Sequence, residues 1–135
     1  NGEEKTLADL SGVEGLVLYV YPKDDTPGCT TEAQDFRDLL DDFQAKGYQV
    51  AGVSPDSAES HCKFIDKHDL TFPLLTDADH SFLETIGAYG EKKLYGKTLE
   101  GVIRSTFVVD RDGTLEAAHR NVRARGHAAR VLRDL

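Results

Sequence analysis

The sequence predicts an α/β fold in which a mixed central β-sheet is flanked by helices, formed by a single domain over residues 1–135. Two observations predict this class. Segments with strand character alternate with segments in which apolar residues recur every three to four positions, as in proteins whose sheet is covered by helices. A two-stranded hairpin late in the chain adds antiparallel pairing to strands that helices connect in parallel. The length suits one hydrophobic core.

The first predicted strand leads directly into the first predicted helix. Residues 16–21 read LVLYVY, a nearly continuous apolar run that is typical of a strand buried on both faces, and Pro22 ends it. From Thr26 the apolar residues follow a helical period as far as Phe43, and Gly47 supplies the stop.

A second strand and helix repeat this order. Residues 48–54 predict the strand, and either Asp56 or Ser57 can cap a helix that continues to about His68. Residues 72–76 then predict a short third strand.

The last part of the chain predicts a short helix, a long loop, a β-hairpin and a final helix. Such an order, βαβ followed by ββα, is similar to the thioredoxin arrangement with an insertion. The predicted elements are a helix at 81–86 closed by Gly87, a loop at 88–101 with three glycines and two tyrosines, a strand at 105–109, a turn at 110–113, its partner at 114–119 and a helix from about His127 to the end.

Composition excludes several classes of partner and location. A net charge of −8 argues against nucleic acid, and no apolar run is long enough to cross a membrane. Two cysteines are too few for a secreted disulfide scaffold, so we expect free thiols in a reducing compartment, the cytoplasm. The chain opens on Asn1-Gly2, a hairpin-turn dipeptide, without methionine. This predicts missing N-terminal residues and a strand before the turn, and it leaves an organelle such as the chloroplast as the alternative location.

One of the two cysteines lies where the first helix begins. Thr26 is a good N-cap, Pro27 suits the first helical position, and Cys29 then falls in the first turn. Unpaired backbone N–H groups and the helix dipole favour a thiolate there. Cys29 precedes Ala33 by four residues and so faces inward, while Gly28 lets a ligand approach the backbone closely. The alternative is a half-buried cysteine that packs as a small hydrophobe.

The neighbouring residues complete a recognisable motif. Pro22, Thr26 and Cys29 form the array P-x-x-x-T-x-x-C, which is the active-site signature of the peroxiredoxins. The blocks YPKDDTPGCTTEAQDFRD, SHCKFIDKHDLTFPLLTD, YGKTLEGVIRSTFVVD and RNVRARGHAARVL occur in that order. Together they resemble the PrxQ, or bacterioferritin-comigratory, subfamily over almost the whole chain.

The resemblance implies that Cys29 is a peroxidatic cysteine. Its thiolate attacks one peroxide oxygen, the other oxygen leaves in water or an alcohol, and a sulfenic acid remains. The hydroxyl of Thr26 and the backbone N–H groups of Gly28 and Cys29 are then expected to face the peroxide, with Pro22 covering the thiolate.

The resemblance also assigns two charged residues to the site. Arg104, in GVIRSTFVVD, matches an arginine that steadies the thiolate and the peroxide, and Glu32 would hold its guanidinium in place. Without the resemblance, Arg104 reads as a solvated residue at a strand end. Glu32 reads equally well as a first-turn carboxylate that satisfies the helix dipole.

The second cysteine departs from a common pattern of this subfamily. Many relatives carry a resolving cysteine five residues after the peroxidatic one, where this chain has Gln34, so the remaining candidate is Cys62 in SAESHCKFIDKH. Some relatives place theirs on this helix about one turn later, nearer Ile65. Cys62 lies at the edge of the predicted inward face, and the alternative is a packed or idle cysteine in a one-cysteine enzyme. That inward face consists of Ala58, His61, Phe64, Ile65 and His68.

The remaining polar residues carry no further motif. The five histidines form no set with known metal-ligand spacing, which disfavours a metal site. The acidic pairs Asp24-Asp25 and Asp41-Asp42 are predicted to be solvated surface. The histidines in question are His61, His68, His80, His119 and His127.

The resemblance therefore implies a monomeric peroxidase that reduces hydrogen peroxide and small organic hydroperoxides. Thioredoxin or a similar dithiol would supply the electrons, and no metal, haem or flavin would take part. A thiol–disulfide oxidoreductase on the same fold is disfavoured because Cys29 has no Cys-x-x-Cys partner. A non-catalytic thioredoxin-fold binding module is the other rival, but it would not need Thr26, Cys29 and Arg104 together.

Overall fold

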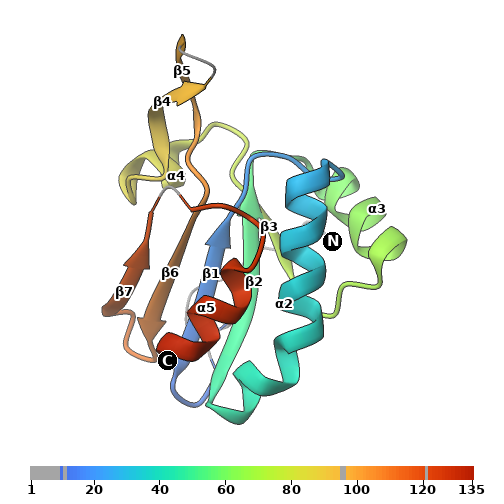
Figure 1. Ribbon diagram of the computed structural model, residues 1–135, viewed down its shortest axis with the longest axis vertical. Coiled ribbons are helices and arrows are strands. Elements are labelled where there is room, and N and C mark those ends of the chain that lie inside the picture. Colours follow the sequence, from blue (N-terminus) through green and yellow to red (C-terminus); the bar gives the residue numbers. More distant parts are fainter. Residues whose placement is uncertain (1–9, 11, 95–96, 121) are drawn as a thin grey trace.

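The computed structural model describes residues 10, 12–94, 97–120 and 122–135, and its centre is a five-stranded mixed sheet (Figure 1). The strand order is β3-β2-β1-β6-β7. β1 pairs in parallel with β2 and antiparallel with β6, β2 pairs in parallel with β3, and β6 pairs antiparallel with β7. The strands are β1 (Gly15–Val20), β2 (Tyr48–Ser54), β3 (Leu74–Thr76), β6 (Ser105–Asp110) and β7 (Leu115–His119).

Among the described residues, four helices accompany the sheet, and α2 and α5 lie together against one of its faces (Figure 1). Alternate residues of β1 point to opposite faces, as the pleat of a strand requires. Val17 and Tyr19 join the core beneath α2 and α5, whereas Leu16 and Leu18 join a second core that includes Leu83 of α4. The helices are α2 (Pro27–Ala45), α3 (Ala58–His68), α4 (Ser81–Thr85) and α5 (His127–Asp134).

The predicted fold class, a thioredoxin-like α/β fold with a mixed sheet, is confirmed, and most element positions agree. Ser57 rather than Asp56 caps α3, because its side-chain oxygen accepts a hydrogen bond from the backbone N–H of Ser60 at 3.1 Å. The third strand is shorter than predicted and begins at Leu74. The strand expected before Asn1-Gly2 lies outside the described residues.

The prediction of a loop over 88–101 is wrong. This segment forms an antiparallel hairpin of β4 (Tyr89–Leu94) and β5 (Lys97–Val102), a separate two-stranded sheet that projects from the fold (Figure 1). The projecting position of this hairpin explains the error, because strands that extend away from the main sheet need no alternation of apolar and polar residues. Their pairing depends on backbone hydrogen bonds, which the sequence does not reveal.

The topology determines where the candidate cysteine lies. β1 and β2 are parallel, so the chain must leave β1 at one edge of the sheet and cross through α2 before it returns. The N-terminus of α2 therefore lies beyond the carboxyl end of β1, the edge at which α/β folds bind ligands. Within the described residues, no helix is long and apolar enough to span a membrane.

Candidate active site

Cys29 occupies the first turn of α2, which begins at Pro27 as predicted. Its side chain is only 2% exposed, so the predicted inward position is confirmed. Gly28 directly precedes Cys29 in the chain. A Cβ added at Gly28 would lie 3.4 Å from the guanidinium of Arg104 and 3.8 Å from the side chain of Ala124. Glycine at this position therefore keeps the backbone bare where a ligand would approach the sulfur.

Arg104 comes from a distant part of the chain and contacts this thiol. It lies in the short link between β5 and β6, and its Nη2 donates to the Sγ of Cys29 at 3.1 Å. Its Nη1 donates to Oε1 of Glu32 on α2. One guanidinium thus holds both the sulfur and a carboxylate, the forked geometry that distinguishes arginine from lysine. Although burial acts to lower the pKa of Arg104, Glu32 and the thiol raise it, so the side chain stays charged.

Glu32 is completely buried, with 0% of its surface exposed. The first turn of α2 contains no acidic residue, so the alternative reading of Glu32 as a first-turn carboxylate is wrong. Burial raises its pKa to about 7, even though Arg104 acts in the opposite direction. Its second oxygen, Oε2, has no hydrogen-bond partner among the described residues, which adds to the cost of ionisation. Glu32 is therefore a carboxyl group that titrates near neutral pH while it positions Arg104.

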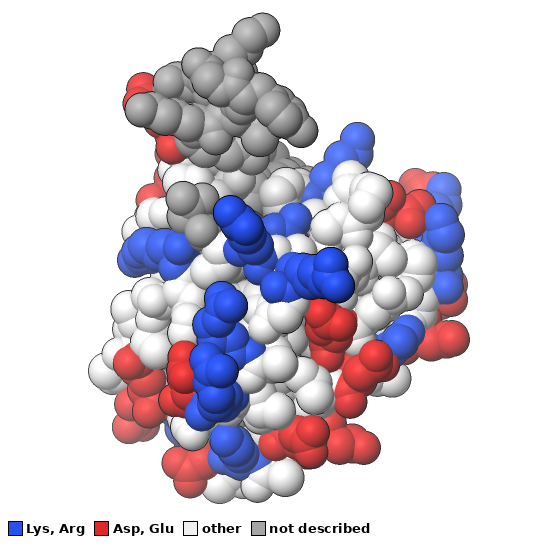
Figure 2. All heavy atoms as spheres, in the orientation of Figure 1, with Lys and Arg blue, Asp and Glu red and all other residues white. Residues whose placement is uncertain are grey.

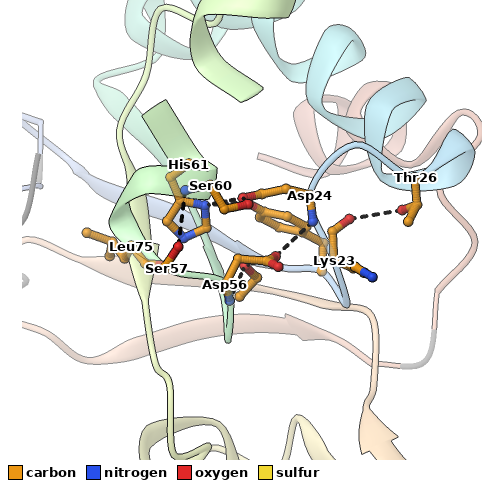
Figure 3. Close-up of polar contacts among 10 residues, drawn as sticks. Lys23, Asp24, Thr26, Asp56, Ser57, Ser60, His61 and Leu75 are labelled. Atoms are coloured by element: carbon orange, nitrogen blue, oxygen red, sulfur yellow. Dashed lines mark hydrogen bonds and ion pairs between the residues drawn. The ribbon is translucent and has the colours of Figure 1, made fainter. Parts of the chain in front are cut away.

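Thr26 is the N-cap residue of α2, but its side chain does not cap the helix. Its hydroxyl instead donates to the backbone carbonyl of Lys23 at 2.9 Å (Figure 3). The lone pairs of this oxygen thus remain free to accept a hydrogen bond from a ligand. Pro22 is half-buried at the end of β1, and its covering of the thiolate stays a prediction.

The surface around the site is basic. Figure 2, drawn in the orientation of Figure 1, shows Lys and Arg side chains gathered over the middle of this face, with Asp and Glu mostly around its edge. Arg123, Arg125 and Arg130 are exposed, and the first two flank Ala124, which lies beside Gly28. Exposed arginines thus lie in the segment beside the site, although the chain carries a net charge of −8.

Cys62 lies on α3, and both cysteines are free thiols. Its side chain is exposed, whereas His61 and Phe64 on the same helix are buried, as predicted for the inward face. The alternative of a packed Cys62 is therefore wrong, and the choice between a resolving and an idle thiol stays open. Cys29 is buried and Cys62 faces solvent, so a bond between them needs a change of local structure.

The prediction of solvated surface is wrong for Asp24, and it holds for Asp25. Asp24 is 6% exposed and accepts hydrogen bonds from Tyr21, Ser60 and His61. Asp25 is exposed and pairs with Lys67. A run of charged residues is typical of an exposed loop, and this pattern predicts the wrong environment for Asp24. The buried position of His61 was a usable signal, since a buried ring nitrogen needs a polar partner. Asp41 and Asp42 are exposed as predicted.

Among the described residues, no group of three or more His, Cys, Asp and Glu side chains is placed to hold a metal ion. The site so far consists of a helix-start thiol, a threonine, an arginine and a buried carboxyl group on a thioredoxin-like fold. This arrangement defines a thiol-based redox protein.

Comparison with known proteins identifies the family. Residues 1–118 match the AhpC/TSA family. A relative from Mycobacterium tuberculosis is 53% identical over the whole chain and 85% of its own length, and Peroxiredoxin Bcp of Bacillus subtilis is 46% identical over the same shares. A solved structure of Peroxiredoxin Q from Xanthomonas campestris superposes with a TM-score of 0.88 at 43% identity, over 96% of this chain and 82% of that one. The chain therefore belongs to the AhpC/TSA family, as a peroxiredoxin of the Bcp/PrxQ subfamily.

Proposed function

We propose that this peroxiredoxin reduces hydrogen peroxide and organic hydroperoxides with the thiolate of Cys29. The observation that carries the proposal is the 3.1 Å contact from the Arg104 guanidinium to the Cys29 sulfur, at the positive end of a helix. A helix N-terminus and an adjacent arginine are the two environments that most favour a thiolate. The related protein of Xanthomonas campestris is described as having alkyl peroxide reduction activity, which supports organic hydroperoxides as substrates.

The proposed first step is attack of the Cys29 sulfur on one peroxide oxygen. The O–O bond breaks, the attacked oxygen stays on sulfur as a sulfenic acid, and the other leaves as water or an alcohol after taking a proton. The backbone N–H groups of Gly28 and Cys29 are among those at the start of α2 that lack intrahelical partners, and they can donate to the peroxide oxygens. Thr26, whose own proton goes to Lys23, accepts from the peroxide O–H.

Arg104 then serves the transition state as well as the thiolate. As negative charge moves from sulfur onto the leaving oxygen, a fixed cation beside both atoms stabilises the charge without having to reorganise. Glu32 keeps the guanidinium in that position through its contact with Nη1. Pro22, half-buried where β1 ends, is assigned the role of shielding the sulfur from bulk water.

We assign the second step to Cys62, with thioredoxin or a similar dithiol as the final reductant. Exposure of Cys62 supports this role, because a resolving thiol must be reachable by a displaced Cys29. The second candidate is a one-cysteine enzyme in which Cys62 takes no part. It is favoured by the separation of a buried and an exposed thiol in the folded protein.

The test compares Cys29→Ser with Cys62→Ser. The chain has no tryptophan, so peroxide consumption is followed by competition with a haem peroxidase rather than by tryptophan fluorescence. Cys29→Ser should keep its circular dichroism spectrum and lose peroxide consumption. Cys62→Ser should consume one equivalent, stop at a sulfenic acid that dimedone traps, and lose turnover with thioredoxin. Near-normal consumption by Cys29→Ser would refute the proposal, and full thioredoxin-supported turnover by Cys62→Ser would leave the one-cysteine alternative.

A further inference from the structure

Two segments of the chain hold the thiols that the proposed second step would join. One is the link from β1 to α2, residues 21–26, which leads into the turn that holds Cys29. The other is the start of α3, which carries Cys62. A buried polar cluster that none of the proposed catalytic steps uses connects these two segments (Figure 3).

Asp24 in the first segment is the centre of this cluster. Its Oδ1 accepts from the hydroxyl of Tyr21, and its Oδ2 accepts from Ser60 at 2.7 Å and from Nδ1 of His61 at 2.8 Å. Its backbone N–H donates to Asp56 at 2.8 Å. These side-chain contacts favour the ionised form of the carboxyl group. Burial acts to raise the pKa of Asp24, but the hydrogen bonds from His61, Tyr21 and Ser60 lower it below the usual range.

His61 is the matching group on α3, directly before Cys62 in the chain. It is 2% exposed, and its two ring nitrogens face the carboxylate of Asp24 and the backbone carbonyl of Leu75, the latter at 2.9 Å. The ring thus connects α3 with the link through Asp24 and with β3 through Leu75. His61 and Asp24 form a buried polar pair, and loss of one partner leaves the other buried without its contact.

The neighbouring residue offers a comparison within the same link. Asp25 also reaches α3, through Lys67 at 3.0 Å, but both side chains are more than half exposed. Exposed pairs of this kind add little to stability. A hollow of about 310 Å³, lined in part by Asp24, Asp25, Ser60 and Phe64, opens between the link and α3. The hollow leaves part of this boundary unpacked, and the buried cluster spans it beside the ring contact of Tyr21 with Phe64.

We propose that the buried Asp24–His61 pair is a latch that couples the opening of the two redox segments. The effect on disulfide formation rests on the proposed function, whereas the joint opening of the two segments does not. While the latch is closed, the link into α2 and the start of α3 hold their folded forms, in which Cys29 faces Arg104. When it opens, both segments are released together, and the Cys62 thiol attacks the Cys29 sulfenic acid to form a disulfide and water. Asp24 and His61 are thus positioning residues for the second step.

The experiment compares Asp24→Ala with Asp25→Ala, Asp24→Asn and Ser60→Ala in the reduced protein. Amide hydrogen exchange is read at residues 30–33 of α2 and 61–64 of α3. In Asp24→Ala both sets should exchange about tenfold faster or more, by similar factors, which corresponds to about 1.4 kcal/mol of opening free energy. The matched control Asp25→Ala should stay within about threefold of the parent, because its contacts with Lys67 and His68 are made by a carboxylate that is 52% exposed.

Two further variants keep the test decisive. Asp24→Asn retains an acceptor for Tyr21 and keeps a polar group against Nδ1 of His61, so it should restore most of the protection. If Asp24→Ala fails to fold, Ser60→Ala removes one donor from the latch and should still speed exchange in both segments. Faster exchange in α3 alone, in neither segment, or equally in Asp25→Ala overturns the latch.

The kinetic readout separates this inference from the proposed function. After one equivalent of peroxide, Asp24→Ala should form the disulfide at least about tenfold faster than the parent, with its sulfenic acid step changed by less than about twofold. An unchanged rate of disulfide formation in a folded Asp24→Ala overturns the latch as a control on resolution. Absence of a trappable sulfenic acid in Cys62→Ser would contradict the proposed function, and hydrogen exchange would still decide the latch.

Discussion

Replacement of Arg104 by alanine should slow the reaction of Cys29 with peroxide by about 100-fold or more, the cost of losing one fixed donor to a developing charge. The structure gives two reasons for so large an effect. The guanidinium is only 16% exposed, so water does not substitute for it. Its 3.1 Å contact to the sulfur is the only hydrogen bond to that atom found among the described residues.

Arg104→Lys should lie between the parent and Arg104→Ala, with a loss of about tenfold. Lysine keeps the charge but has no planar fork, so it does not contact the sulfur and Glu32 with two fixed donors. The fold should survive both changes because Glu32 can take up a proton. Burial already raises its pKa to about 7 with Arg104 present, and loss of the cation raises it further.

The assay is single-turnover competition with a haem peroxidase for hydrogen peroxide at pH 8, where Glu32 is ionised in the parent. Glu32→Gln is the matched control, because its amide oxygen still accepts from Arg104 without charge. It should lose about tenfold or less, since it loosens the guanidinium without removing it. Arg104→Ala with a rate within threefold of the parent would show that the guanidinium is not part of the chemistry.

The remaining predictions concern a hydroxyl and a buried histidine. Thr26→Val should slow the peroxide step by about tenfold or more while Thr26→Ser stays near the parent, and equal rates for the two would remove the hydroxyl from the mechanism. Burial lowers the pKa of His127 to about 4. Above the usual histidine pKa of about 6.5 this shift costs no folding stability, and as the pH falls below that value the free energy of unfolding decreases. Urea unfolding should therefore show that the parent, compared with His127→Gln, loses about 2 kcal/mol more on going from pH 8 to pH 5, and parallel pH profiles would contradict this.

Local sequence determined most elements of this fold, apart from the hairpin of β4 and β5, and half of its site. The position of Cys29 follows from Thr26, Pro27 and the helical period that begins there, because caps and periodicity act within a few residues. The apolar run of β1 and the stop at Gly47 were readable for the same reason. The motif shared with peroxiredoxins added Arg104, which no local signal indicates.

Only the tertiary structure decided how residues far apart in the chain meet. The forked contact of Arg104 with Cys29 and Glu32 depends on β6 pairing antiparallel with β1, which brings the end of β5 to the start of α2. The burial of Asp24 depends in the same way on α3 packing against the link from β1. A charged residue in a polar run looks solvated until its partners are known, because three donors from other positions outweigh the cost of removing it from water.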